Sequence, residues 1–156
     1  QTAKISGLAV DPTKTFGSNI AYHVNNRGVG DVKVELGLLD IPVALYVKAL
    51  GYENDDDILD FGADTVSKDV AILLESNTAD GGGAYYGFYK GNLSMDAIDL
   101  NTIKDKAEEL ATTDVSFAAG ASTDEQTKNK YGTMYFGSDE TKIKKLKAKL
   151  GMTVAG

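Results

Sequence analysis

A change of hydrophobic period within Asp31–Gly51 constrains the fold of this chain more than any other feature of its sequence. Across Val32–Leu38, aliphatic residues alternate with polar residues or glycine, which predicts a half-buried strand. Apolar residues then recur at helical spacing across Asp40–Leu50, where the first residue suits an N-cap and Pro42 suits the first turn. Gly51 can adopt the left-handed conformation that ends a helix. We therefore expect a strand that runs directly into a short helix folded over a sheet.

The other segments supply the strands of that sheet. The 17 glycines and 2 prolines suit a mainly β (α+β) fold with many tight turns.

The sequence also predicts where the strands lie, with one ambiguous segment. Ile98–Ala111 fits either a helix or a strand edge. Strict alternation in the tyrosine-rich strand places Tyr86, Phe88 and Lys90 on one face. Strands are predicted within Gln1–Val10 with a bend at Gly7, Thr15–Asn25, Lys68–Glu75, Ala84–Met95, Thr112–Ala118 and Tyr131–Phe136.

The C-terminal region predicts a second helix. Ser138 suits its N-cap, and the acids Asp139 and Glu140 suit the first turn, where the helix dipole favours negative charge. Gly151 is placed to end the helix. The apolar stripe consists of Ile143, Leu146 and Leu150. A length of 156 residues without a linker predicts a single domain with a real core.

The sequence lacks the residue sets that catalysis and metal binding need. It contains no cysteine, and its one histidine, His23, lies in an alternating strand, so thiolate and multi-histidine metal sites are excluded. No GxSxG motif and no Walker A sequence occurs. The acidic run Asp55–Asp60 does not match EF-hand spacing, so a solvated loop is the better interpretation. We expect no enzymatic activity, no metal and no cofactor.

Two segments of opposite charge stand out. Acids crowd Glu53–Asp69, which is expected to be an exposed loop with a short strand at Ile58–Phe61. The C-terminal helix carries 5 lysines, for which a solvent face is the plainer interpretation. In a repeating assembly the two segments would meet across a subunit boundary. The candidate inter-subunit contacts are Glu53, Asp55, Asp56, Asp57, Asp60, Lys142, Lys144, Lys145 and Lys147.

The overall charge limits the class of partner. A formal net charge of −7 argues against nucleic-acid binding, because affinity for phosphate comes largely from lysine and arginine. The same sign suits a wall past which DNA slides without sticking. No apolar run approaches the length of a membrane span, so we expect no membrane contact.

Two stretches share their order and spacing with a known protein family. The first is GDVKVELGLLDIPVALYVKALGYE, and the second is AYYGFYKGNLSM. The matching positions are Glu35, Leu36, Leu38, Asp40, Pro42, Leu50 and Gly51, followed by Tyr89, Lys90, Gly91, Leu93 and Ser94. Over roughly residues 16–118 the chain resembles the major tail proteins of long-tailed, non-contractile phages of Gram-positive hosts.

The resemblance implies a structural virion protein. The family's fold would be a β-sandwich or partly closed barrel with a flanking short helix. The acidic loop and the C-terminal helix depart from the family's pattern, so the expected fold adds a C-terminal helix. Residues 1–12 are expected to form an N-terminal arm, and residues 139–156 the C-terminal helix and tail. Six copies would form a ring, and stacked rings would form a tube through which DNA passes without specific binding. The implied partners are further copies of this chain and the tape measure, tail terminator and baseplate proteins. The implied location is the virion tail, after assembly in the host cytoplasm.

A different class of function stays open beside the tail tube. The tyrosine-rich strand around Tyr85–Tyr89 offers rings on which sugars could stack, as in a carbohydrate- or surface-binding β-sandwich module. An enzyme that uses His23 is a third and weaker alternative.

Overall fold

The computed structural model describes residues 2–9, 13–17, 20–25, 28–39, 41–98 and 113–152. Strands dominate these residues, which confirms the prediction of a mainly β fold. The elements are β1 (Thr2–Ser6), β2 (Thr13–Gly17), β3 (Ile20–Asn25), β4 (Lys33–Leu38), α1 (Val43–Lys48), β5 (Glu53–Asp55), β6 (Ile58–Asp60), β7 (Asp69–Asn77), β8 (Gly83–Met95), β9 (Thr113–Gly120), β10 (Gly132–Phe136) and α2 (Glu140–Lys149).

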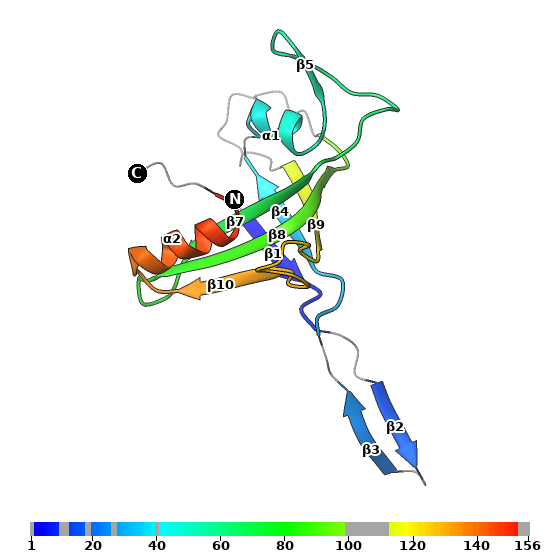
Figure 1. The fold of residues 1–156 in the computed structure, drawn as a ribbon. Helices are drawn as coiled ribbons and strands as arrows, with labels where there is room; N and C mark the ends of the chain where they lie inside the picture. The colour runs from blue at the N-terminus through cyan, green and yellow to red at the C-terminus, as the bar shows by residue number, and fades with distance from the viewer. Residues whose placement is uncertain are drawn as a thin grey trace, which may run out of the picture.

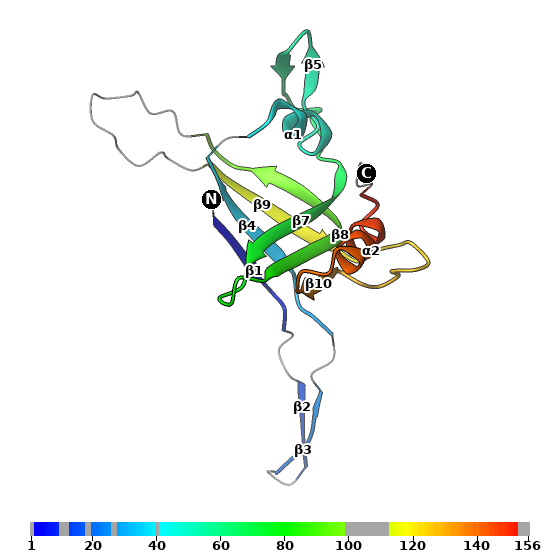
Figure 2. The same cartoon turned by 90° about the vertical axis from the view of Figure 1, so that its left-hand side faces the viewer.

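A single antiparallel sheet of 6 strands forms the body of the protein, in the order β1-β4-β9-β8-β10, with β7 on the other side of β8. The long strand β8 joins the sheet together. Its first half pairs with β10 and its second half with β9, while β7 follows most of its opposite edge. Figures 1 and 2 show the sheet curling, which corresponds to the partly closed barrel of the two predicted architectures.

The core lies on the inner face of this curled sheet. It centres on Val34, Val115 and Phe117, which are essentially inaccessible to solvent. Because β4 and β9 pair with Val34 opposite Phe117, alternating residues of both strands enter the core together. The inner face therefore matches the alternation predicted for Val32–Leu38.

A β-bulge in β8 overturns the predicted faces of that strand. The register shifts between Val70 and Ile72 of β7, so that Tyr89 and Lys90 together stand opposite one residue of β7. Phe88 and Leu93 are both buried in the core, although strict alternation would place them on opposite faces. Lys90 consequently lies on the outer face and not, as predicted, beside Phe88. The error arose because alternation assumes an unbroken period.

Helix α1 closes one end of the sheet, as predicted (Figure 1). It is shorter than expected, because Pro42 is its N-cap residue and its carbonyl accepts the Leu45 N–H at 2.9 Å. Asp40, the predicted cap, lies outside the described residues. Leu50, just beyond the helix, is buried in the core, and Gly51 has the predicted left-handed φ of 77°.

The prediction of one strand across Thr15–Asn25 is wrong. The segment forms two antiparallel strands, β2 and β3, in which Gly17 pairs with Ile20. The Gly-Ser-Asn run after Phe16 favours a turn. The prediction missed this turn because apolar residues alternate on both sides of it and suggested one continuous strand. Figures 1 and 2 show this β2–β3 hairpin projecting away from the sheet.

Two smaller differences concern segments near the charged regions. The predicted exposed loop contains the expected short strand β6, but β5 pairs with it to form a hairpin. Helix α2 begins one residue later than predicted, because Asp139 and not Ser138 is the N-cap and its carboxylate accepts the Thr141 N–H at 2.9 Å. Apart from its first residue, Ile98, the ambiguous segment up to Ala111 lies outside the described residues.

Candidate assembly surfaces

Three strands of the sheet have one unpaired edge among the described strands. β1 pairs only with β4, whereas β7 and β10 each pair only with β8. The edges of β1 and β7 face each other across the curl of the sheet. A cleft of about 740 Å³ runs between them, with Ala3 and Ile5 on the β1 side and Leu74 on the β7 side. Apolar side chains also reach it from β4. An edge beside an exposed apolar cleft favours pairing with another chain.

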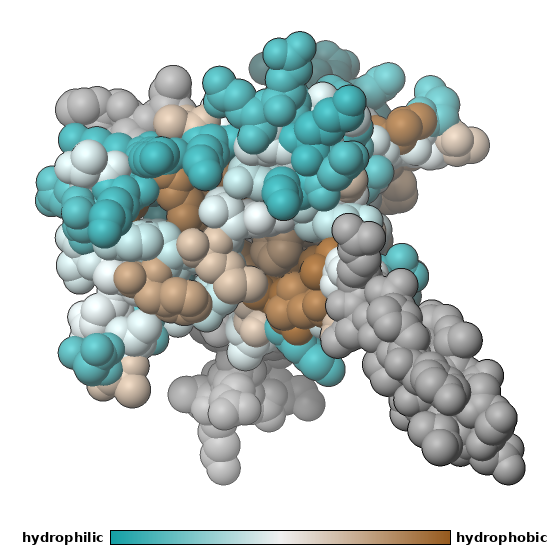
Figure 3. Space-filling model, turned by 60° about the horizontal axis from the view of Figure 1, so that its bottom comes forward, coloured by the Kyte–Doolittle hydropathy of each residue, from teal (hydrophilic) through white to brown (hydrophobic). Residues whose placement is uncertain are grey.

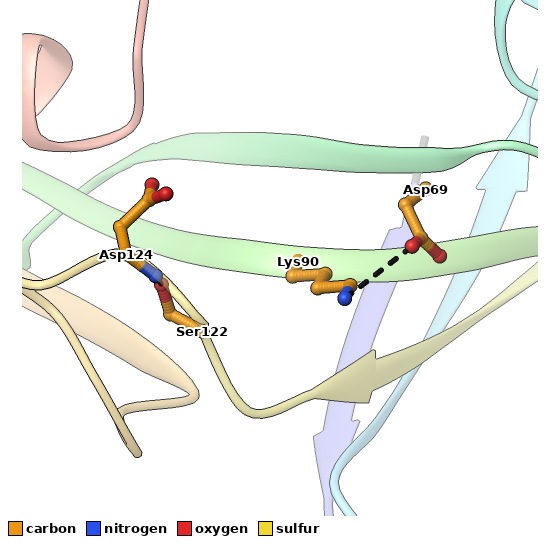
Figure 4. Close-up of polar contacts among 4 residues, drawn as sticks. All are labelled: Asp69, Lys90, Ser122 and Asp124. Atoms are coloured by element: carbon orange, nitrogen blue, oxygen red, sulfur yellow. Dashed lines mark hydrogen bonds and ion pairs between the residues drawn. The ribbon is translucent and has the colours of Figure 1, made fainter.

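The outer face of the sheet over β1, β4, β9 and the end of β8 is polar and balanced in charge. Register places Lys4 opposite Glu35 and Glu35 opposite Ser116, all of them exposed. The Lys90 ammonium lies 3.5 Å from an Asp69 carboxylate oxygen, and Figure 4 draws this ion pair. The charged residues of this face are Lys4, Lys33, Lys90, Glu35, Asp69 and Asp114. Three positive and three negative charges cancel.

The predicted acidic residues gather on the β5–β6 hairpin. All five of them, Glu53, Asp55, Asp56, Asp57 and Asp60, are exposed. The turn is built by Asp56 and Asp57, whose φ values are 52° and 66°, as a two-residue hairpin turn requires. The side-chain oxygen of Asn54 accepts the Asp57 N–H at 2.9 Å and fixes the turn. The hairpin therefore holds a dense negative charge away from the sheet (Figure 1).

The predicted basic residues lie on α2, which packs against the outer face of β8. Leu146 and Leu150 of its apolar stripe are buried, and the Leu150 side chain lies over Gly87 of β8. Lys142, Lys144 and Lys145 are exposed. Lys147 differs from them, since its ammonium lies 3.4 Å from a Glu75 carboxylate oxygen in the same chain. Within the chain, α2 and the β5–β6 hairpin lie apart in both views (Figures 1 and 2).

Within the described ranges, no three histidine or acidic side chains come close enough together to hold a metal ion. One shifted carboxyl is that of Asp80, whose pKa lies below its ordinary value because the Thr78 hydroxyl and nearby backbone N–H groups donate hydrogen bonds to it. This exposed group belongs to the turn between β7 and β8. No helix in the described ranges is long and apolar enough to cross a membrane.

The tyrosines of β8 stack within the chain. Tyr85 stacks on Tyr135 of β10 with ring centroids 6.2 Å apart, and Tyr86 meets Phe136 edge-on at 5.7 Å. Both tyrosines are half-buried. These contacts occupy faces that an open sugar-stacking platform would need free.

A curled β sheet with unpaired edges and projecting hairpins is suited to assembly. A family model described as phage tail tube protein matches residues 1–150 of the chain. This chain belongs to that family. No curated protein and no solved structure gives a significant match to it.

The family confirms the resemblance noted in the sequence, and this tail tube protein is a structural component of the virion tail. The Gram-positive host and the non-contractile tail stay predictions. Sequence reasoning found both charged segments and their exposure. It missed the β2–β3 hairpin and the cleft between β1 and β7, because the cleft depends on how the sheet curls and no local pattern encodes it.

Proposed function

We propose that this tail tube protein forms hexameric rings that stack into a tube, and that the phage genome passes through the tube. The unpaired edges of β1 and β7 carry the proposal, since in a closed ring each edge can be satisfied by a neighbouring subunit. The apolar cleft between these edges would then be covered. The β2–β3 hairpin projects from the sheet (Figure 2), and we propose that it extends toward an adjacent ring.

The polar outer face of β1, β4, β9 and the end of β8 is proposed to line the channel. DNA slides where the wall offers neither an apolar surface nor an excess of positive charge. This face meets both conditions, because its lysines Lys4, Lys33 and Lys90 are matched by as many acids. The sequence led us to expect an acidic channel wall. The acids of the β5–β6 hairpin lie outside this face, so the proposed lining is closer to neutral than the net charge of −7 suggests.

The two charged segments are proposed to meet between subunits, as the sequence suggested. The acidic β5–β6 hairpin of one subunit would contact the exposed lysines of α2 on another. Lys142, Lys144 and Lys145 are available for this contact, whereas Lys147 already has a partner in Glu75. Exposed charge pairs contribute little energy individually, so the contact mainly sets register and orientation.

The remaining parts of the proposal concern context. Tube ends require partners that terminate the stack and join it to the baseplate, and a tape measure protein would occupy the channel before DNA does. Assembly takes place in the host cytoplasm. The role is structural, without catalysis and without a cofactor.

Electron microscopy of the purified protein tests the proposal. We expect negative-stain images of rings and tubes at concentrations above a threshold. A protein that stays a monodisperse monomer at high concentration, with the β1 and β7 edges unprotected in hydrogen exchange, would contradict it. A glycan array serves as the companion measurement, because a carbohydrate-binding module would give signals where a tube protein gives none.

A further inference from the structure

An aromatic stack runs from the core to the surface and ends in an exposed ring. The ring centroids of Tyr46 and Tyr52 lie 5.6 Å apart, and those of Tyr52 and Phe61 lie 5.3 Å apart. Tyr46 and Tyr52 pack against the core, whereas Phe61 is 74% exposed. A large ring held in place on one side and open on the other is suited to stack on a partner.

Two aliphatic residues within five positions of Phe61 in the sequence are exposed as well. Ile58 is 66% and Val66 is 73% exposed. We name Ile58, Phe61 and Val66 the apolar knob. The hydrogen bond from Asp57 to Asn54 fixes the hairpin that carries Ile58, so part of the knob is ordered before it meets a partner.

A hollow of about 460 Å³ on the β10 side of the sheet can receive such a knob. It is lined by Leu8, Val29, Tyr86, Tyr131 and Met134, among others. Figure 3 shows hydrophobic side chains gathered near the centre of this face, between hydrophilic margins. We name this site the β10 hollow.

Charge distinguishes the β10 hollow from the other apolar clefts. Among the described residues that line it, Lys130 carries the one charged side chain. Of the two largest alternatives, one has Glu75 as its only charged lining residue among the described ones, and the other is lined by Glu75 together with its ion-pair partner Lys147. The knob is flanked by Asp60 and Asp64, and no basic residue lies between Glu53 and Ser67. An acidic knob is attracted to a hollow with an unbalanced lysine at its wall, repelled by a cleft with an unbalanced glutamate, and gains no net attraction from a cleft whose lysine is already paired.

The knob and the hollow lie toward opposite ends of the molecule. In both Figures 1 and 2, the β5–β6 hairpin stands at one end, and the described segments that follow β1 (residues 7–9) and precede β4 (residues 28–32) lie at the other. Leu8 and Val29 belong to those segments and line the β10 hollow. Head-to-tail contact between such ends joins identical copies without limit unless the rotation closes.

We propose that the apolar knob of one subunit inserts Phe61 into the β10 hollow of the subunit in the next ring, with Lys130 facing Asp60 or Asp64. The occupant is therefore a second copy of this chain. The inference rests on the proposed tube. The acidic tip at Asp56 and Asp57 remains free to contact α2 of another neighbour.

Cysteine cross-linking tests the contact, because the chain has no cysteine of its own. The variant F61C/M134C is assembled and oxidised with copper phenanthroline, and is then separated on a denaturing gel without reductant. We expect a ladder that extends beyond the number of subunits in one ring, since each subunit links to one above and one below. Each single variant is the matched control and should stop at dimers.

Three results would overturn the inference. Tubes of F61C/M134C without a ladder would show that the two residues do not meet. A ladder that stops at the size of one ring would place the contact around the ring and not along the tube. If the wild-type protein forms no tubes, the proposed function is wrong as well. Failure of the knob contact alone would leave wild-type tubes intact, so the two outcomes can be told apart.

A second variant keeps the test decisive if the double cysteine variant does not assemble. Phe61→Ala should raise the critical concentration for tube formation by about 10-fold or more, because a buried aromatic contact is lost. Leu39→Ala removes an aliphatic side chain that is 48% exposed and lies outside both knob and hollow, and should leave the critical concentration within about 2-fold. Equal values for the two variants would refute the role of Phe61.

Discussion

The contact between α2 and the sheet can be measured through Gly87 and Leu150. Leu150 is 7% exposed, and a Cβ added at Gly87 would lie 2.6 Å from its Cδ1. Leu150→Ala should reduce the free energy of unfolding by about 3 kcal/mol. Gly87→Ala should reduce the free energy of unfolding by ~1 kcal/mol. The added methyl group overpacks against Leu150 at a cost of ~1–3 kcal/mol, and replacing a glycine in a strand interior offsets part of that cost.

The two changes should not add. In the double variant, the new methyl group occupies space that the leucine has left, so the loss should be ~1 kcal/mol smaller than the sum of the single losses. Thermal unfolding followed by circular dichroism measures this, with a fall of ~2–4 °C in the midpoint for each 1 kcal/mol in a domain of this size. Chemical denaturation gives the free energies directly.

A glycine in the same sheet provides the control. A Cβ at Gly120 would meet only the Lys90 carbonyl oxygen, at 3.9 Å, so Gly120→Ala should be neutral or slightly stabilising. Additive losses at Gly87 and Leu150, or equal losses at Gly87 and Gly120, would show that α2 does not dock on β8 as described.

Four further predictions concern assembly and the β7–β8 turn. Reversing Lys144 and Lys145 to Glu should weaken tube formation, and wild-type tubes should become less stable as the salt concentration rises. If sedimentation shows neither effect, the proposed charge contact is wrong. Ala3→Lys, at the β1 edge of the cleft, should lower assembly without lowering the unfolding midpoint by more than ~2 °C. Replacing the β2–β3 hairpin by a short Gly-Ser linker should likewise spare the midpoint but shorten or abolish tubes in micrographs, because the two strands contact chiefly each other. The Thr78 hydroxyl lowers the pKa of Asp80, so the hydrogen bond between them stabilises the turn above about pH 4. This stabilisation is lost as the pH falls through the lowered pKa. In an NMR titration, Thr78→Val should therefore raise the pKa of Asp80.

The sequence was most informative where one local rule acts alone. The switch of period near Asp40 predicted the succession of β4 and α1, although α1 is shorter than expected, because the strand and the helix each pack apolar side chains against the core. Rules failed where two of them competed. At Gly17 a turn signal competed with an alternation that continued beyond it, and in β8 a bulge at Tyr89 reversed the alternation.

The candidate site shows a different limit. The exposure of the acids and lysines followed from their charge, since desolvating a charge is costly. Which surfaces meet depends on the curl of the sheet and on a second copy of the chain. Phe61 illustrates this, because its sequence context places it at the end of a short strand and says nothing of the aromatic stack beneath it.

The position of β8 also decides how the sheet opens. β9 and β10 each pair with β8 and are not paired with each other in the described sheet. Loss of β8 would therefore separate β10 from β9 and from the rest of the sheet. β7 covers the opposite edge of the same strand. Opening β8 would therefore remove the pairing of three other strands at once, so we expect the backbone amides of β8 to exchange only with the largest opening of the sheet, whereas the edge strands can open locally.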